Sequence, residues 1–195
     1  MHPDICAFTS ELFYEGKLGA KAEAAGQRVN AKGIANGTGL RFLPVEHSGN
    51  QNCSSEEADV IAELVSGILA QGATWIDREG NEKPLEIADI LIIAPYNAQV
   101  FEIQRRLPQA RVGTVDKFQG QEAPISIYSL ASSSHADAPR GMEFLYSLNR
   151  LNVATSRAKC VTILVGSRQV FEAECRTPRQ MQLANAFCRY LELSS

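Results

Sequence analysis

Short apolar runs rich in β-branched residues recur along the chain, and longer stretches with helical periodicity lie between several of them. Apolar runs of this length, without alternation of polar residues, are typical of strands that are buried on both faces of a parallel sheet. The pattern predicts five such strands, over residues 40–45, 89–94, 111–115, 124–130 and 160–165.

The stretches between these runs predict amphipathic helices. Ser54 and Glu57 have the spacing of a capping box, in which Ser54 accepts from a free amide and Glu57 reaches back. Asn97 is positioned to cap a second helix, and a last helix is expected over residues 180–193. The spacing of apolar residues identifies the face of each helix that packs against the core. On the first helix this face consists of Ile61, Leu64, Val65 and Ile68, and on the second of Val100, Ile103 and Leu107.

Strands that alternate with helices predict an α/β fold with a mainly parallel sheet and helices on both faces. We expect five to seven strands, with the loops that carry the motifs gathered at one edge of the sheet. Residues 1–195 fit a single domain. Residues 16–39 and 132–141 are expected to be irregular insertions, and residues 75–84 a hairpin that turns near Gly80.

Composition narrows the class of protein. The chain is 45% hydrophobic and 21% charged, as soluble globular proteins are, and a net charge of −3 disfavours a dedicated duplex-DNA binder. Single-strand binding remains compatible with that charge. No apolar run is long enough for a membrane span, and the N-terminus does not have the pattern of a signal peptide. We therefore expect a cytoplasmic protein with no membrane contact. The five cysteines show no Cys-x-x-Cys spacing, which favours free thiols and no metal site.

Two stretches carry the most informative chemistry. The first, VGTVDKFQGQE over residues 112–122, follows a predicted strand and contains Thr114, Asp116 and Gly120. The second, NRLNVATSRAK over residues 149–159, predicts a helix with Arg150, Ala154 and Arg157 on one side and apolar residues on the other. An arginine suits a phosphate because it is always charged and presents a rigid fork of donors.

These two stretches resemble motifs V and VI of superfamily 1 helicases. Residues 92–99, with Pro95, Tyr96 and Gln99, resemble motif IV of the same family. The opening Met-His-Pro resembles the end of a motif in the branch that contains the nonsense-mediated decay and immunoglobulin-switch-binding helicases. The resemblance extends from residue 1 to about residue 164 and follows the family's order of motifs.

The resemblance implies the C-terminal RecA-like domain of such a helicase, a member of the P-loop NTPase superfamily. No Gly-x-x-x-x-Gly-Lys-Ser/Thr phosphate loop occurs in the 195 residues. Arg157 would then be an arginine finger on the γ-phosphate of ATP, and Arg150 a second catalytic candidate. The family's pattern assigns Gln119, Gly120 and Glu122 to ATP. It assigns Pro95, Tyr96, Thr114 and Asp116 to nucleic acid.

The implied partners are ATP with Mg²⁺, single-stranded nucleic acid with DNA favoured over RNA, and an N-terminal RecA-like domain of the same parent. That domain would carry the Mg²⁺ ligands, so this chain alone is expected not to hydrolyse ATP. The alternative is a non-catalytic RecA-like module for nucleic-acid binding or partner docking. An unrelated α/β enzyme would need a nucleophile or acidic cluster, and the sequence shows no such set.

Structural interpretations stand beside several of these functional ones. Asp116 would serve equally well as a helix cap, and Tyr96 as a ring packed over the end of a strand. Gln99 and Lys117 would ordinarily face water on a surface, and Phe118 would belong to the core.

Overall fold

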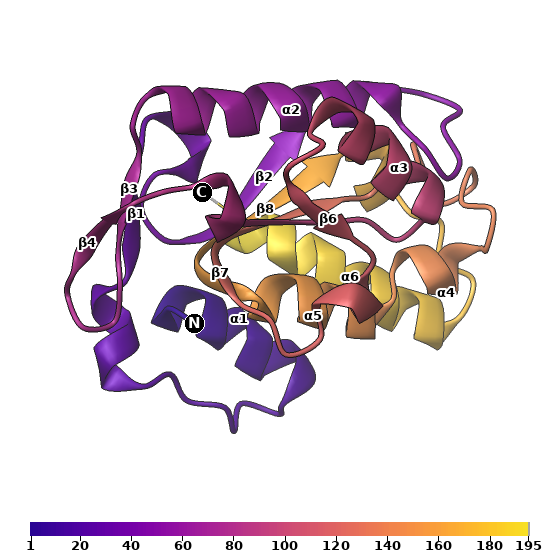
Figure 1. The fold of residues 1–195 in the computed structure, drawn as a ribbon. Coiled ribbons are helices and arrows are strands. Elements are labelled where there is room, and N and C mark those ends of the chain that lie inside the picture. Colours follow the sequence, from indigo (N-terminus) through magenta and orange to yellow (C-terminus); the bar gives the residue numbers. More distant parts are fainter. Residues whose placement is uncertain (195) are drawn as a thin grey trace.

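The computed structural model describes residues 1–194, so Ser195 lies outside the described residues. A five-stranded sheet is built from β2 (Gly39–Pro44), β5 (Ile90–Ile93), β6 (Arg111–Gly113), β7 (Ala123–Ser129) and β8 (Ala158–Gly166), as Figure 1 shows. The strand order is β2-β8-β7-β5-β6, and every neighbouring pair is parallel. Each predicted strand is present, so the expected α/β fold with a parallel sheet is confirmed.

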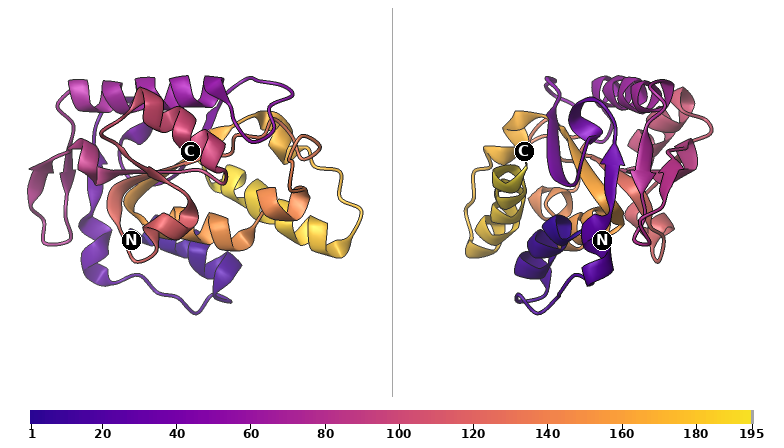
Figure 2. Two further views of the ribbon diagram at one scale, coloured as in Figure 1. Left: turned by 45° about the vertical axis from the view of Figure 1, so that its right-hand side comes forward. Right: turned by 90° about the vertical axis from the view of Figure 1, so that its left-hand side faces the viewer.

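Helices cover both faces of this sheet (Figures 1 and 2). On one face, α2 (Ser55–Ala70) and α3 (Asn97–Arg106) pack against strand residues such as Ile92 and Ile127. On the other, α1 (Pro3–Phe13), α5 (Leu148–Ser156) and α6 (Pro178–Leu193) enclose residues such as Tyr128, with the single turn α4 (Met142–Leu145) beside them. All seven residues of β7 are buried, which accounts for the unbroken apolar runs.

A second, antiparallel sheet contains β1 (Arg28–Asn30), β3 (Thr74–Ile76) and β4 (Glu82–Pro84), in the order β1-β3-β4. Strands β3 and β4 form the predicted hairpin, with Gly80 at φ 84° in its turn. Within residues 16–39, where the sequence predicts irregular structure, the chain forms β1 and two short 3₁₀ helices. A three-residue strand whose partner residues lie 44 to 48 positions away is too short to give a periodic signal.

Two predicted caps differ in detail from the structure. Ser54 caps α2 by accepting from the Glu57 amide at 3.1 Å, but the Glu57 side chain turns inward and is fully buried. Asn97 is the first residue of α3 rather than its cap, because Tyr96 occupies that position. Among the described residues, no helix has both the length and the apolar character required to cross a membrane.

Candidate functional site

The candidate residues are divided between the two edges of the parallel sheet. Thr114 follows β6 and Pro95 follows β5, so both lie at the edge where the strands end. Glu122 precedes β7 and Arg157 precedes β8, so both lie at the edge where the strands begin. The expectation that all motif loops gather at one edge is wrong. A connection between parallel strands has to return the chain from the carboxyl edge to the amino edge, and residues 114–122 make that return.

Helix α5 links the two edges. Ser147 caps it by accepting from the Arg150 amide at 3.5 Å, and the helix ends at Ser156, with Arg157 as its C-cap. The helix predicted over residues 149–159 therefore begins one residue earlier, at Leu148, and ends three residues earlier, because β8 begins at Ala158. Ala154 was expected beside the arginines on the outer side but is fully buried, and its carbonyl accepts from Ser126 Oγ at 2.8 Å. The reason is that α5 packs against α1 as well as against the sheet.

At the amino edge, a main-chain hydrogen bond joins the two stretches that the sequence predicts to contact ATP. The Ala123 amide donates to the Arg157 carbonyl at 3.0 Å, which brings together Glu122 and Arg157, the residues that precede the adjacent strands β7 and β8. Arg157 is half-buried, and its Nη2 donates to Ser156 Oγ at 3.0 Å. Its buried Nε has no partner within residues 1–194. Gly120, at φ 76°, lies in the exposed loop before Glu122 and leaves open space where a side chain would be.

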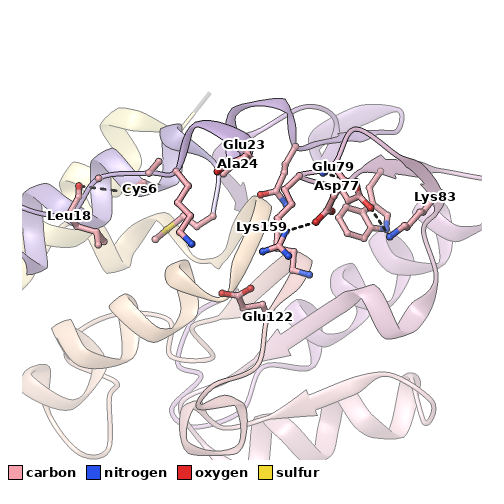
Figure 3. Close-up of a pocket in the computed structure, with 16 residues that line it drawn as sticks. Cys6, Leu18, Glu23, Ala24, Asp77, Glu79, Lys83, Glu122 and Lys159 are labelled. Atoms are coloured by element: carbon pink, nitrogen blue, oxygen red, sulfur yellow. Dashed lines mark hydrogen bonds and ion pairs between the residues drawn. The ribbon is translucent and has the colours of Figure 1, made fainter.

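A cavity of about 790 Å³, called here the amino-edge hollow, opens beside Glu122 (Figure 3). Lys159 of β8 and Trp75 of β3 also line it, with the Lys159 Nζ 5.4 Å from the centre of the indole ring. On the hairpin, Lys83 pairs with Asp77 at 2.7 Å, and this contact lowers the pKa of Asp77. The hollow thus brings cationic and acidic side chains in equal number to an aromatic face near Glu122. The sequence did not reveal this feature because its residues come from distant segments.

A smaller cavity of about 370 Å³, called here the carboxyl-edge hollow, lies at the other end of α5. The structure brings together in its lining all four residues predicted to contact nucleic acid, Pro95, Tyr96, Thr114 and Asp116. Arg150 lines the same cavity. The two arginines that were predicted to act together are therefore separated, with Arg150 at this edge and Arg157 at the other.

The Tyr96 ring is packed inside the protein and does not present an open face for stacking. Only 7% of it is exposed, and its ring lies 5.1 Å from that of Phe144, tilted by 31°. Its hydroxyl is 3.5 Å from Ser132 Oγ, and burial raises the pKa of the phenol. The ring that shares the hollow with the arginines is Phe144, which sequence reasoning missed. The sequence signal that could have revealed Phe144 is the short stretch from Arg140 to Phe144, which begins where the irregular segment 132–141 ends.

Three other residues also take definite positions. Asp116 lies in the first turn of the 3₁₀ helix Val115–Phe118, whose cap is Thr114, so the interpretation of Asp116 as the cap is wrong. Lys117 does not simply face water, because its Nζ donates to the Val112 carbonyl at 2.7 Å. Phe118 is a core residue, as expected, with 1% exposure.

A network of buried polar side chains lies next to the carboxyl edge of the sheet. Gln99, expected on the surface, is fully buried, and it donates to Ser129 Oγ at 2.9 Å and accepts from the Ser54 amide at 2.7 Å. The Glu57 carboxylate accepts from the Ala131 amide at 3.1 Å, and Ser129 donates to it as well. Ala131 has a φ of 66°, a conformation that this anchoring helps to hold.

His47 completes the network. Its Nε2 lies 3.0 Å from Glu57 Oε1, and its Nδ1 lies 2.8 Å from Ser133 Oγ. These distances are those of a serine–histidine–acid triad. However, Ser133 and Glu57 are fully buried and His47 nearly so, which leaves no room for a substrate. The hydrogen bonds of the network hold in place the segment that follows β7. Within the described chain, no group of three or more His, Cys, Asp or Glu side chains is arranged to hold a metal ion.

Comparison with known proteins shows which family the chain is similar to. The family model described as AAA domain matches residues 1–169. DNA polymerase alpha-associated DNA helicase A of Schizosaccharomyces pombe is 30% identical over 189 residues, which cover 85% of this chain and 26% of that protein. Putative regulator of nonsense transcripts 1 of Takifugu rubripes is 30% identical over 188 residues, which cover 86% of this chain and 16% of that protein. The chain thus spans about a quarter or less of the length of these relatives.

Proposed function

This chain belongs to the AAA domain family, and we propose that it works as the C-terminal motor domain of an ATP-dependent superfamily 1 helicase. Its helicase relatives and its RecA-like sheet support the coarser assignment to a helicase domain that uses ATP and acts on nucleic acid. The position in the parent, the arginine finger and the single-stranded substrate are our proposals. The carrying observation is the pairing of Glu122 and Arg157 through the Ala123–Arg157 hydrogen bond.

In this proposal, Arg157 neutralises charge on the transferring γ-phosphate. Its half-buried guanidinium has a buried Nε with no partner among residues 1–194, so donor capacity remains for a ligand. An unsatisfied buried donor is costly, and such groups concentrate at functional sites. Glu122 is exposed and lines the amino-edge hollow, where its carboxylate would accept from a ribose hydroxyl. Gln119 and Gly120 would contact the nucleotide from the loop before it.

The remaining groups for phosphoryl transfer would come from another RecA-like domain of the parent. These are the phosphate loop, the Mg²⁺ ligands and the residue that orients the attacking water. Closure of the two domains around ATP would then alternate with opening. At the carboxyl edge, Pro95, Tyr96, Thr114 and Asp116 would contact the strand, with DNA favoured over RNA.

The competing function is a non-catalytic RecA-like module that binds nucleic acid or docks a partner. A module of this kind has no use for Arg157 as a finger. The two functions are distinguished by mixing this chain with the phosphate-loop domain of its parent and measuring ATP turnover with saturating single strand. Turnover that depends on this chain and falls with Arg157→Ala supports the motor. Equal turnover with and without this chain contradicts it.

A further inference from the structure

We propose that Arg140 and Arg150, both stacked on Phe144, form a phosphate clamp that grips the backbone of a single strand in the carboxyl-edge hollow. The proposal rests on the proposed function, because it concerns the same nucleic-acid site. It gives Arg150 a different role from the catalytic one expected from the sequence, and it adds a residue, Arg140, that no motif indicated.

The two guanidinium groups converge on one aromatic ring. The Cζ of Arg150 lies 3.8 Å from the centre of the Phe144 ring, and the Cζ of Arg140 lies 4.6 Å from it. Both distances are well within the range of a cation–π interaction. A cation–π interaction of this kind uses the charge of the guanidinium and leaves its N–H donors for other partners. Those donors are the ones that bind two phosphate oxygens at once.

Neither side chain is committed elsewhere. Within residues 1–194, the guanidinium groups of Arg140 and Arg150 form no ion pair and no hydrogen bond, unlike Arg106 and Arg189, which are held by carboxylates. Both line the hollow, with Arg140 exposed and Arg150 partly buried. Among the described residues that line the hollow, Asp116 is the single carboxylate, against two arginines. The hollow is therefore cationic, although the net charge of the whole chain is −3.

A further feature of the hollow favours an anion. Asn97 and Ala98, the first two residues of α3, line it, and main-chain amides at the start of a helix point out with no partner inside the helix. A phosphodiester between the arginines and the α3 amides would thus find donors on two sides.

The segment that leads to Arg140 is anchored at its start. Glu57 accepts from the Ala131 amide, and Ser132 donates to the Gln51 carbonyl. Arg140 lies at the exposed end of this segment. The clamp is therefore assembled by three elements that are separate in the sequence, namely the segment 132–141, α4 and α5.

The test is binding of this chain to a fluorescent single-stranded oligonucleotide, with DNA and RNA forms measured over a series of salt concentrations. Arg140→Ala and Arg150→Ala should each weaken binding about tenfold. Each should also reduce the slope of log affinity against log salt by about 0.7, the amount for one lost phosphate contact on a single strand. The matched control is Arg105→Ala, which removes an exposed arginine paired with Glu102 on α3 and should leave both quantities unchanged.

The Arg150→Lys variant distinguishes the proposed clamp from attraction by positive charge alone. A lysine keeps the cation but loses the stacked, forked geometry, so the salt slope should be retained while affinity still falls several-fold. Thermal melts of all variants report on folding. Normal affinity and slope in both alanine variants, with the wild-type chain binding the strand, overturn the clamp and leave the proposed function standing. Failure of the wild-type chain to bind either oligonucleotide overturns both.

Discussion

The amide of Ala123 donates to the carbonyl of Arg157 at 3.0 Å, and the Cα atoms of Ala123 and Ala158 are paired at the start of β7 and β8. This contact places Glu122 and Arg157 side by side at the amino edge although they are separated by more than thirty residues in the sequence. Both strands lie inside the sheet and are almost wholly buried, so the backbone that carries the two residues is held by the core of the fold.

The isolated chain should bind Mg·ATP only weakly, with a dissociation constant in the millimolar range or above, and should not hydrolyse it. The chain contains no phosphate loop, whose amides provide most of the anion binding in this superfamily. Isothermal titration calorimetry measures the affinity, and phosphate release measures turnover. A micromolar dissociation constant for this chain would contradict the view that the nucleotide is shared with another domain.

Glu57→Ala should lower the free energy of unfolding by about 3 kcal/mol or more, because it leaves His47, Ser129 and the Ala131 amide without their buried partner. Glu57→Gln keeps the shape and should lose less. The control is Glu63→Ala on the same helix, which removes an exposed carboxylate and should change stability by less than about 0.5 kcal/mol. Urea denaturation measures all three, and equal midpoints for the two alanine variants would show that the network is not stabilising.

Gly120→Ala should destabilise the chain by about 1 kcal/mol, because Gly120 has a φ of 76° and an L-residue is strained there even though nothing lies within 4 Å of the added carbon. Gly67→Ala is the matched substitution. Gly67 lies inside α2 with equally open space around it, so alanine there should stabilise by about 0.5–1 kcal/mol. Opposite signs are the expected result in chemical denaturation. A stabilising Gly120→Ala would mean that the loop before Glu122 does not hold this conformation.

The sequence predicted the parallel sheet because each strand is buried on both faces, which leaves an unbroken apolar run. It also predicted that Thr114 and Pro95 lie where strands end, because each stands at the end of such a run. It did not predict that Arg150 and Arg157 would separate. Helical periodicity places residues around a helix axis, but it does not show that the two ends of α5 reach opposite edges of the sheet.

The polar network was also beyond prediction. Glu57 and Gln99 are residue types that ordinarily face water. Their burial depends on partners such as His47 and Ser129, which become neighbours only when β2, β7 and the starts of α2 and α3 come together. Similarly, Phe144 has no periodic signal because α4 is a single turn. Features that arise from tertiary contacts between short or irregular segments therefore had to be found in the structure.

The central claim, that Arg157 is the arginine finger of a shared ATPase site, is tested most directly by steady-state ATPase of the full-length parent with saturating single strand. Arg157→Ala should lower turnover by roughly 10³-fold and Arg157→Lys should restore little, because the transition state loses a forked donor set. Arg105→Ala serves as the control, and a thermal melt should show each variant folded. Turnover of Arg157→Ala near that of the wild type, with an unchanged melting temperature, would contradict the assignment and leave Arg157 as an ordinary helix-terminal arginine.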